Sequence, residues 1–212
     1  DFNYKEDQSL DIKNSLYSLN NALATGGFSL EISKNYQLKK PLVVYNNFSN
    51  SLKETIVNYK NSLILNENSE LNLINYINNS SKENFMVNTL ENIKIKKDST
   101  LKNILINSSK CNGYFHKYIK SDVEKNSTFE NYLLSSGLRF NKLDIEINLN
   151  EENANSSVFS ALNLMNNEHQ EIKTRINHNS PNCNSYQKVK NVLNDESKGV
   201  YQGKIFVKNI AQ

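Results

Sequence analysis

A short turn motif recurs through most of this chain at nearly constant spacing. Each copy reads as a polar residue, a small residue, one or more further positions and then an apolar residue, and the small residue falls at positions 69, 99, 127, 154 and 183. The successive steps are therefore 30, 28, 27 and 29 residues. A repeat built only of β-rich runs and turns is too short for a propeller blade and lacks the helix of most other repeat classes. The sequence predicts an all-β fold, a right-handed parallel β-helix with coils of about 28 residues.

The clearest strand in this pattern runs from position 143 to 149. Its apolar residues alternate strictly with Asp144, Glu146 and Asn148, so we expect one face in a core and the other in water. Plain solvation is the expected role of Asp144 and Glu146. Further strands are expected at 28–32, 42–45, 62–65, 71–77, 85–90, 101–106 and 205–207.

Proline and glycine are scarce, at 2 and 6 residues. In a parallel stack a proline removes a ladder hydrogen bond, so Pro41 and Pro181 should lie at turns or strand starts. Four of the six glycines are placed near the two ends of the repeat array: Gly26, Gly27, Gly199 and Gly203.

The first 27 residues form a lead-in to the repeats, and residues 28–212 form the expected β-helix core. Residues 1–14 are polar and patternless. From 15 to 23 the apolar residues fall at 16, 19 and 23, a spacing that predicts a short helix ended by Gly26-Gly27.

Composition excludes several classes of protein. The 25 basic and 22 acidic residues are interspersed and give a net charge of +3, without the basic stripe that nucleic acid requires. No apolar run is long enough to cross a membrane. Two cysteines 72 positions apart, Cys111 and Cys183, form no disulfide framework and favour a reducing compartment. Asparagine makes up close to a fifth of the chain; it tolerates left-handed turns, and its amides can form ladders from turn to turn.

The candidates for chemistry are few. No histidine has the partners of a nucleophilic triad. His116, among aromatic residues, is expected at the edge of the core with one hydrogen bond, and His169 in a solvated turn. His178 and Cys183 are separated by five residues across a proline-containing turn, and both residue types bind zinc or iron. The alternative is that the turn requires them for its shape, with Cys183 as a small buried residue.

A set of spaced positions near the C-terminal end resembles the β-helix signature of the SufB/SufD family, and SufD more closely than SufB. Those positions are His178, Pro181, Cys183, Ser185, Gln187, Lys190, Gly199, Gly203, Lys204, Ile205, Ala211 and Gln212. The segment Leu19-Asn-Asn-Ala22 is similar to the family's entry into its β-helix. The resemblance implies a core fragment that lacks the family's C-terminal helical tail.

The resemblance further implies a non-catalytic scaffold subunit of iron–sulfur cluster assembly. Its implied partners are a SufB-like paralogue in a heterodimer and the SufC-like ABC-type ATPase, with a homodimer possible in isolation, and neither nucleic acid nor membrane. No catalytic residue is carried over, because the family's cluster-building Cys and His would lie beyond position 212. An iron–sulfur cluster is then held transiently by the complex and not firmly by this chain, in the cytoplasm or a plastid-type organelle. The alternative is a secreted parallel β-helix, either polysaccharide-active or adhesive.

Overall fold

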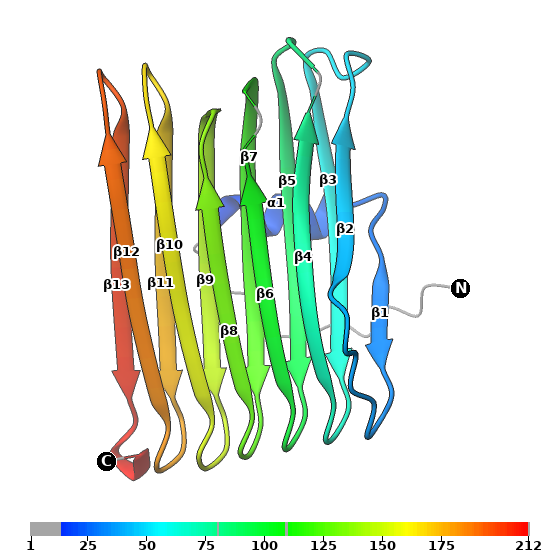
Figure 1. Ribbon diagram of the computed structural model, residues 1–212, viewed down its shortest axis with the longest axis vertical. Coiled ribbons are helices and arrows are strands. Elements are labelled where there is room, and N and C mark those ends of the chain that lie inside the picture. Colours follow the sequence, from blue (N-terminus) through cyan, green and yellow to red (C-terminus); the bar gives the residue numbers. More distant parts are fainter. Residues whose placement is uncertain (1–13, 80, 109, 212) are drawn as a thin grey trace.

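The computed structural model describes residues 14–79, 81–108 and 110–211. Within these ranges the chain forms one helix, α1 (Ser15–Leu23), two parallel β-sheets and a short 3-10 turn at Asn209–Ala211 (Figure 1). The sheet of odd-numbered strands contains β1 (Ser29–Ile32), β3 (Thr55–Leu65), β5 (Phe85–Ile95), β7 (Cys111–Val123), β9 (Leu138–Leu149), β11 (His169–His178) and β13 (Lys198–Val207). The sheet of even-numbered strands contains β2 (Leu42–Phe48), β4 (Glu70–Asn79), β6 (Thr100–Asn107), β8 (Thr128–Ser135), β10 (Asn155–Leu164) and β12 (Asn184–Leu193).

The strands wind into a β-helix, which confirms the predicted fold. In Figure 1 the chain rises along the even-numbered strands at the front, returns down the odd-numbered strands behind and advances from right to left, a right-handed coil. Paired residues of neighbouring coils lie between 26 positions apart, as for Tyr118 and Asp144, and 33 positions apart, as for Leu30 and Leu63. Every ladder is parallel, so each coil repeats the backbone path of the one before it.

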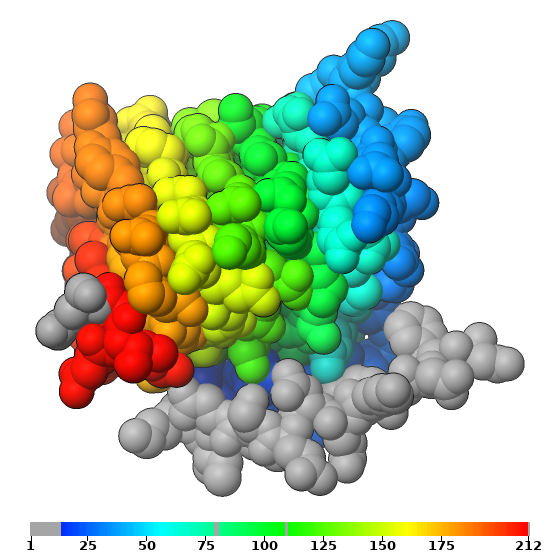
Figure 2. Space-filling model, turned by 90° about the horizontal axis from the view of Figure 1, so that it is seen from below, coloured from blue at the N-terminus to red at the C-terminus, as the bar shows by residue number. Residues whose placement is uncertain are grey.

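The recurring turns are the ones that the sequence predicts. Their polar residue adopts a left-handed conformation with φ between 54° and 59° in five successive coils, at Asn68, Asp98, Asn126, Asn153 and Asn182. These turns stack coil on coil at the end of the molecule that faces the viewer in Figure 2.

The side chains of these turn residues form a ladder of hydrogen bonds from coil to coil. The Asn126 amide donates to Asp98 Oδ1 at 2.9 Å, and the Asn153 amide donates to Asn126 Oδ1 at 3.0 Å. The Asn68 amide donates in the same way to Asn35 Oδ1 at 2.9 Å. Asparagine therefore serves both the backbone conformation of each turn and the contact between turns.

The core lies between the two sheets and follows the two-residue alternation of each strand. In β9 the inward residues Leu143, Ile145, Ile147 and Leu149 are at most 2% exposed. At one edge of the cross-section a second cluster packs Phe48, Phe85 and Phe115 ring against ring, with centroids 5.5 to 5.8 Å apart. Burial of this surface is the main stabilising term for the coils.

Helix α1 lies across the outer face of the odd-numbered sheet (Figure 1). Asn20 on the helix is 1% exposed and donates to the carbonyls of Tyr59 on β3 and Asn88 on β5. The helix occupies residues 15–23 as predicted, while the first thirteen residues of the expected lead-in lie outside the described residues. Asp144 on β9 is buried, so the expectation that it faces water is wrong, because α1 and its N-cap region lie over that part of the sheet.

Five strands were not among the expected runs: β7, β8, β10, β11 and β12. Several of them carry polar residues at inward positions, such as Ser156 and Ser160 in β10 and Gln170 and Thr174 in β11, and this interrupts the apolar alternation. Pro181 lies in a turn and Pro41 directly precedes β2, as predicted.

Candidate functional site

The signature residues from His178 to Ile205 gather in the last coil, formed by β12, β13 and the turn before them, and Ala211 lies in the 3-10 turn that follows. Gln212 lies outside the described residues. His178 ends β11, and its Nε2 lies 2.9 Å from Ser185 Oγ on β12. Partial burial lowers the pKa of His178, and a hydrogen bond to the backbone of Cys183 opposes that shift. His178 thus ties the two sides of the turn together around Pro181 and Asn182.

Cys183 continues a column of small residues inside the turns. Its predecessors in earlier coils are Ser99, Ser127 and Ala154, each at most 1% exposed. Each serine Oγ donates to a backbone carbonyl of a turn, and the Cys183 thiol lies 3.3 Å from the carbonyl oxygen of Glu151 in the same manner.

The geometry of His178 and Cys183 bears on their candidacy as metal ligands. The thiol points at the carbonyl of Glu151 and the imidazole at Ser185. In the part of the chain that the structure describes, no group of three or more His, Cys, Asp or Glu side chains could hold a metal ion. These contacts agree with a role in shaping the turn.

Two glycines of the signature make room for polar side chains inside the last coil. A Cβ at Gly203 would lie 2.6 Å from the hydroxyl of Tyr201, and a Cβ at Gly199 would lie 3.0 Å from the Asn191 amide nitrogen. Gln187 Oε1 accepts hydrogen bonds from Tyr201, at 2.7 Å, and from Thr174. The interior of this coil therefore combines polar groups with aliphatic residues such as Val189 and Ile205, whereas positions 143–149 of β9 are aliphatic inside.

The last coil is also open among the described residues. β12 and β13 are the outermost strands of their sheets, each paired on one side. The coil exposes large apolar side chains to solvent: Tyr186, Val192, Leu193, Val200, Tyr201, Ile205, Phe206 and Val207, each at least 42% exposed. Lys190 and Lys204 are exposed on its outer faces. An open strand edge with exposed apolar residues is a surface that another protein can cover.

A second polar region lies inside the coils and was missed by sequence reasoning. Glu91 on β5 is 1% exposed and forms an ion pair with Lys117 on β7. Lys117 also borders an internal cavity of about 40 Å³ that is lined by Tyr59, Thr89 and Asn75, which is room for about three water molecules. Burial raises the pKa of Tyr59, against the opposing effect of its hydrogen bond with Thr89.

The sequence does carry a signal for the buried pair of Glu91 and Lys117. Glu91 stands between apolar inward residues at 87, 93 and 95, and Lys117 stands between Phe115 and Ile119. A charged residue at an inward position of an alternating strand is costly unless it is paired. Such a pair can position water or a small polar guest inside an otherwise apolar core.

His116 does more than the single hydrogen bond that was expected. Its Nδ1 lies 2.7 Å from Asn88 Oδ1 and its Nε2 lies 3.0 Å from Asp144 Oδ2. The Asn88 amide nitrogen already donates to the Leu16 carbonyl and to Asn58 Oδ1, so Asn88 Oδ1 can only accept. The His116 ring is therefore held between two side-chain oxygens, one from β5 and one from β9.

The partner of His116 is held as a carboxylate. Burial raises the pKa of Asp144, but the hydrogen bond from His116, the charges of Lys142 and His116, and the hydrogen bond from Asn14 outweigh it and hold the pKa below its usual value. The hydrogen bond that Asp144 accepts from Asn14, the N-cap residue, fixes the start of α1 to β9.

His169 differs from its expected place in a solvated turn. It begins β11 with its side chain 30% exposed, and its ring edge packs on Phe140 with centroids 5.2 Å apart. Strand β11 starts one residue after the turn, and this draws the ring against β9.

Two comparisons complete the description of the site. Residues 47–212 match the family described as SUF system FeS cluster assembly, SufBD core domain. No curated protein matches the chain. The matched range includes every strand from β3 to β13 and all signature residues. Among the described residues, no helix is both long and apolar enough to span a membrane.

Proposed function

Because the chain belongs to the SufBD core-domain family of the SUF iron–sulfur cluster assembly system, we propose that it is a SufD-like, non-catalytic scaffold subunit. Its partners are then a SufB-like paralogue and a SufC-like ATPase. The cluster is the cargo of the complex, held transiently and not as a resident cofactor of this chain. The setting is the cytoplasm or a plastid-type organelle.

The open last coil is the observation that carries the proposed partner. A paralogue with coils of the same dimensions can pair its strands with the free edges of β12 and β13, so that the two sheets continue from one subunit into the other. The exposed apolar residues of this coil, among them Ile205 at 54% and Phe206 at 49%, would be buried by the same contact.

The positions of the glycines support the assignment of the ATPase to another subunit. A phosphate-binding loop needs Gly-Lys-Ser or Gly-Lys-Thr after its first glycines, and Gly26-Gly27 is followed by Phe28. The only strand-embedded glycine pair of the signature, Gly199 and Gly203, faces the interior and not a helix N-terminus.

We assign His178 and Cys183 to the shape of the last turn and not to a metal. On this assignment Cys183→Ser keeps the folded state, because serine occupies the same column at 99 and 127 and makes the same kind of hydrogen bond. Iron titration of the isolated chain under anoxic conditions, compared with Cys183→Ser, tests this directly. Stoichiometric iron binding that the substitution removes would overturn the assignment.

The test of the proposed function is size exclusion with light scattering under anoxic conditions, with the chain alone and mixed with the SufB-type subunit from the same source. A 1:1 complex is expected. Ile205→Asp should abolish it, because a charge would then be buried in the contact. Ile56→Asp, at a site 56% exposed on β3, is the matched control and should leave the complex intact. Failure of this chain to bind the SufB-type subunit would contradict the scaffold function.

A further inference from the structure

The outer face of the even-numbered sheet carries two neighbouring rows of apolar side chains. The first row consists of Val43, Ile74, Ile104, Tyr132 and Phe159, which are direct neighbours on β2, β4, β6, β8 and β10. The second row, two residues further along each strand, consists of Tyr45, Tyr76, Ile106, Leu134 and Ala161. We call these ten residues the apolar stripe. It crosses the strands at right angles and is roughly 19 Å long from β2 to β10.

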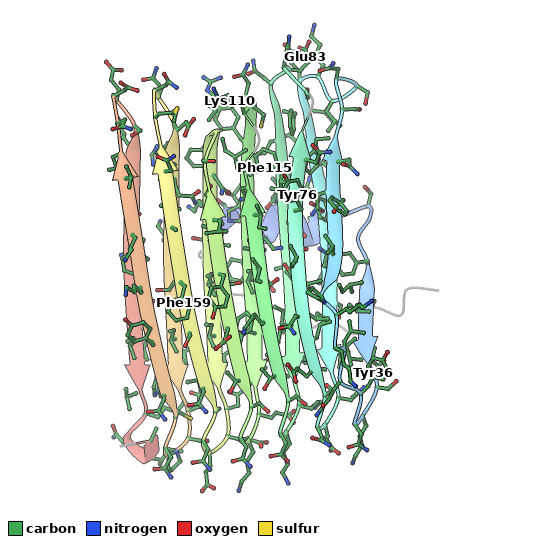
Figure 3. All side chains as sticks on the ribbon, in the orientation of Figure 1. Tyr36, Tyr76, Glu83, Lys110, Phe115 and Phe159 are labelled. Carbon is green, nitrogen blue, oxygen red and sulfur yellow. The ribbon has the colours of Figure 1, made fainter. Side chains whose placement is uncertain are left out.

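The stripe faces solvent. Tyr45 is 64% exposed and Leu134 is 48% exposed, and the rings of Tyr132 and Phe159 stack on each other at 5.0 Å. Figure 3 shows Tyr76 and Phe159 on the front sheet, away from helix α1. Within the described ranges α1 is the one α-helix, and it lies on the other sheet. Contiguous exposed apolar surface of this size, on a chain with a mean hydropathy of −0.65, marks an interaction site.

Charge distinguishes the two ends of the stripe. On β12 the first row continues into Lys188 and the second into Lys190. Both lysines are exposed, and neither forms an ion pair with a described residue. The other charged pair beside the stripe, Lys102 and Glu130, is neutralised internally at 3.3 Å. A partner that covers the stripe would therefore meet positive charge at the β12 end.

The odd-numbered sheet gives an example of an outer face that is covered by a helix. On that sheet, α1 lies across the strands β3 and β5, and Leu90, an outward residue of β5, is 0% exposed. From β2 to β12 the two rows span roughly 24 Å, which matches a helix of about 16 residues.

We propose that the apolar stripe is the docking site for an amphipathic helix of a partner protein, about four turns long, with acidic side chains at the end that lies over β12. The apolar residues of this surface lie on β2 to β10, outside the open last coil, and its two lysines point outward from β12 and not along the free strand edge. The surface therefore adds a contact to the proposed function and does not depend on it. A second copy of the chain fits less well, because its own stripe would offer no unpaired carboxylate to Lys188 and Lys190.

The probe is a set of three stapled 16-residue helical peptides with one apolar face. The acidic peptide has glutamates in its last turn, the basic peptide has lysines there, and the scrambled peptide has the composition of the acidic one without an apolar face. Fluorescence anisotropy with the whole chain should show binding of the acidic peptide, weaker binding of the basic one and none of the scrambled one.

Variants locate the site. Tyr45→Thr combined with Leu134→Thr should weaken the binding of the acidic peptide by about tenfold or more. Ile56→Thr, on the other sheet, should leave that affinity unchanged. Lys188→Glu with Lys190→Glu should reverse the preference toward the basic peptide, and Lys94→Glu, exposed on β5, should leave it unchanged. The lysine positions point into solvent, so this reversal tests the site even if the threonine variants fail to fold by circular dichroism.

Two results would overturn the proposal. The first is absence of binding, or binding that neither the threonine nor the glutamate variants alter. The second is a dimer in sedimentation velocity that Leu134→Thr abolishes while no peptide binds, which would assign the stripe to a second copy of the chain.

Discussion

At the scale of single residues, the left-handed turn positions show most directly how the sequence specifies the coil. Asn126 has φ of 56° and also links the side chains of Asp98 and Asn153. Asn126→Val should lower the free energy of unfolding by about 1–2 kcal/mol, because a β-branched residue is strained in this conformation. Asn126→Gly keeps the turn and loses only the side-chain ladder, so its cost should be smaller. Urea denaturation measures both.

The control for this prediction is Asn163→Val. Asn163 is exposed on the outer face of β10 in an extended conformation, where valine is well tolerated. Equal effects of the valine substitution at 126 and 163 would show that the left-handed turn is not what asparagine provides.

The buried Lys117–Glu91 pair makes a second prediction at this scale. Lys117→Met leaves Glu91 buried without its partner and should cost about 3 kcal/mol. The double variant Lys117→Met with Glu91→Leu should recover most of that loss, because it removes the uncompensated charge. A double-mutant cycle by urea denaturation gives the coupling.

The comparison for that cycle is Lys142→Met. Lys142 lies 3.7 Å from Glu171 in a pair whose side chains are each more than a fifth exposed, so its loss should stay below about 1 kcal/mol. A coupling near zero between Lys117 and Glu91 would contradict the stabilising role of the pair.

At the scale of elements, the docking of α1 depends on the buried pair of His116 and Asp144. His116→Ala should cost about 3 kcal/mol, since it leaves the Asp144 carboxylate buried with fewer donors. Hydrogen exchange should show the loss first in α1 and β9, where Asn14 and Asp144 meet. A uniform increase in exchange along the chain, with α1 no more affected than β2, would contradict the local role of the pair.

The same pair sets a pH dependence. The pKa of Asp144 is depressed in the folded protein, so the unfolded state binds protons more readily at this site. Its contribution to stability is therefore fully present above the unfolded pKa, near 3.9, and is lost as the pH falls through the folded pKa. The difference in urea midpoint between the unsubstituted chain and Asp144→Asn should shrink only below about pH 4. Asp122→Asn, at an outer position of β7, is the control; a difference that stays constant from pH 7 to pH 3 would refute the assignment.

At the scale of the whole molecule, each coil contacts chiefly its two neighbours, so stability should be graded along the axis and not uniform. Strands β5, β7 and β9 have neighbours on both sides and buried inward faces, whereas β12 and β13 are largely exposed. Amide hydrogen exchange by mass spectrometry should be slowest in the first group and fastest in the second. Addition of the SufB-type partner should slow amide exchange most in β13. A single exchange rate for all strands would show that the coils open together.

The sequence by itself determined the coil, because the features that specify it are local. The left-handed asparagines and the small residues after them define each turn within a few positions, and their spacing fixes the coil length. The helix at Ser15–Leu23 was predictable for the same reason. Strands with polar inward residues, such as β11 with Gln170 and Thr174, escaped prediction, because those residues gain their partners from other coils.

Only the tertiary structure decided what the outer and inner faces of the coils do. Asn14 meets Asp144 across 130 positions. Glu91 meets Lys117 because the register of β5 and β7 pairs Lys117 with Thr89 and so places Glu91 diagonally across from it. No short-range pattern contains these contacts, since they depend on the number of residues in every intervening coil and on the sheet face over which α1 lies. Each turn is specified by its own residues, so the period of the solenoid can be read from the sequence. The neighbours of a given side chain depend instead on the lengths of all the coils between them.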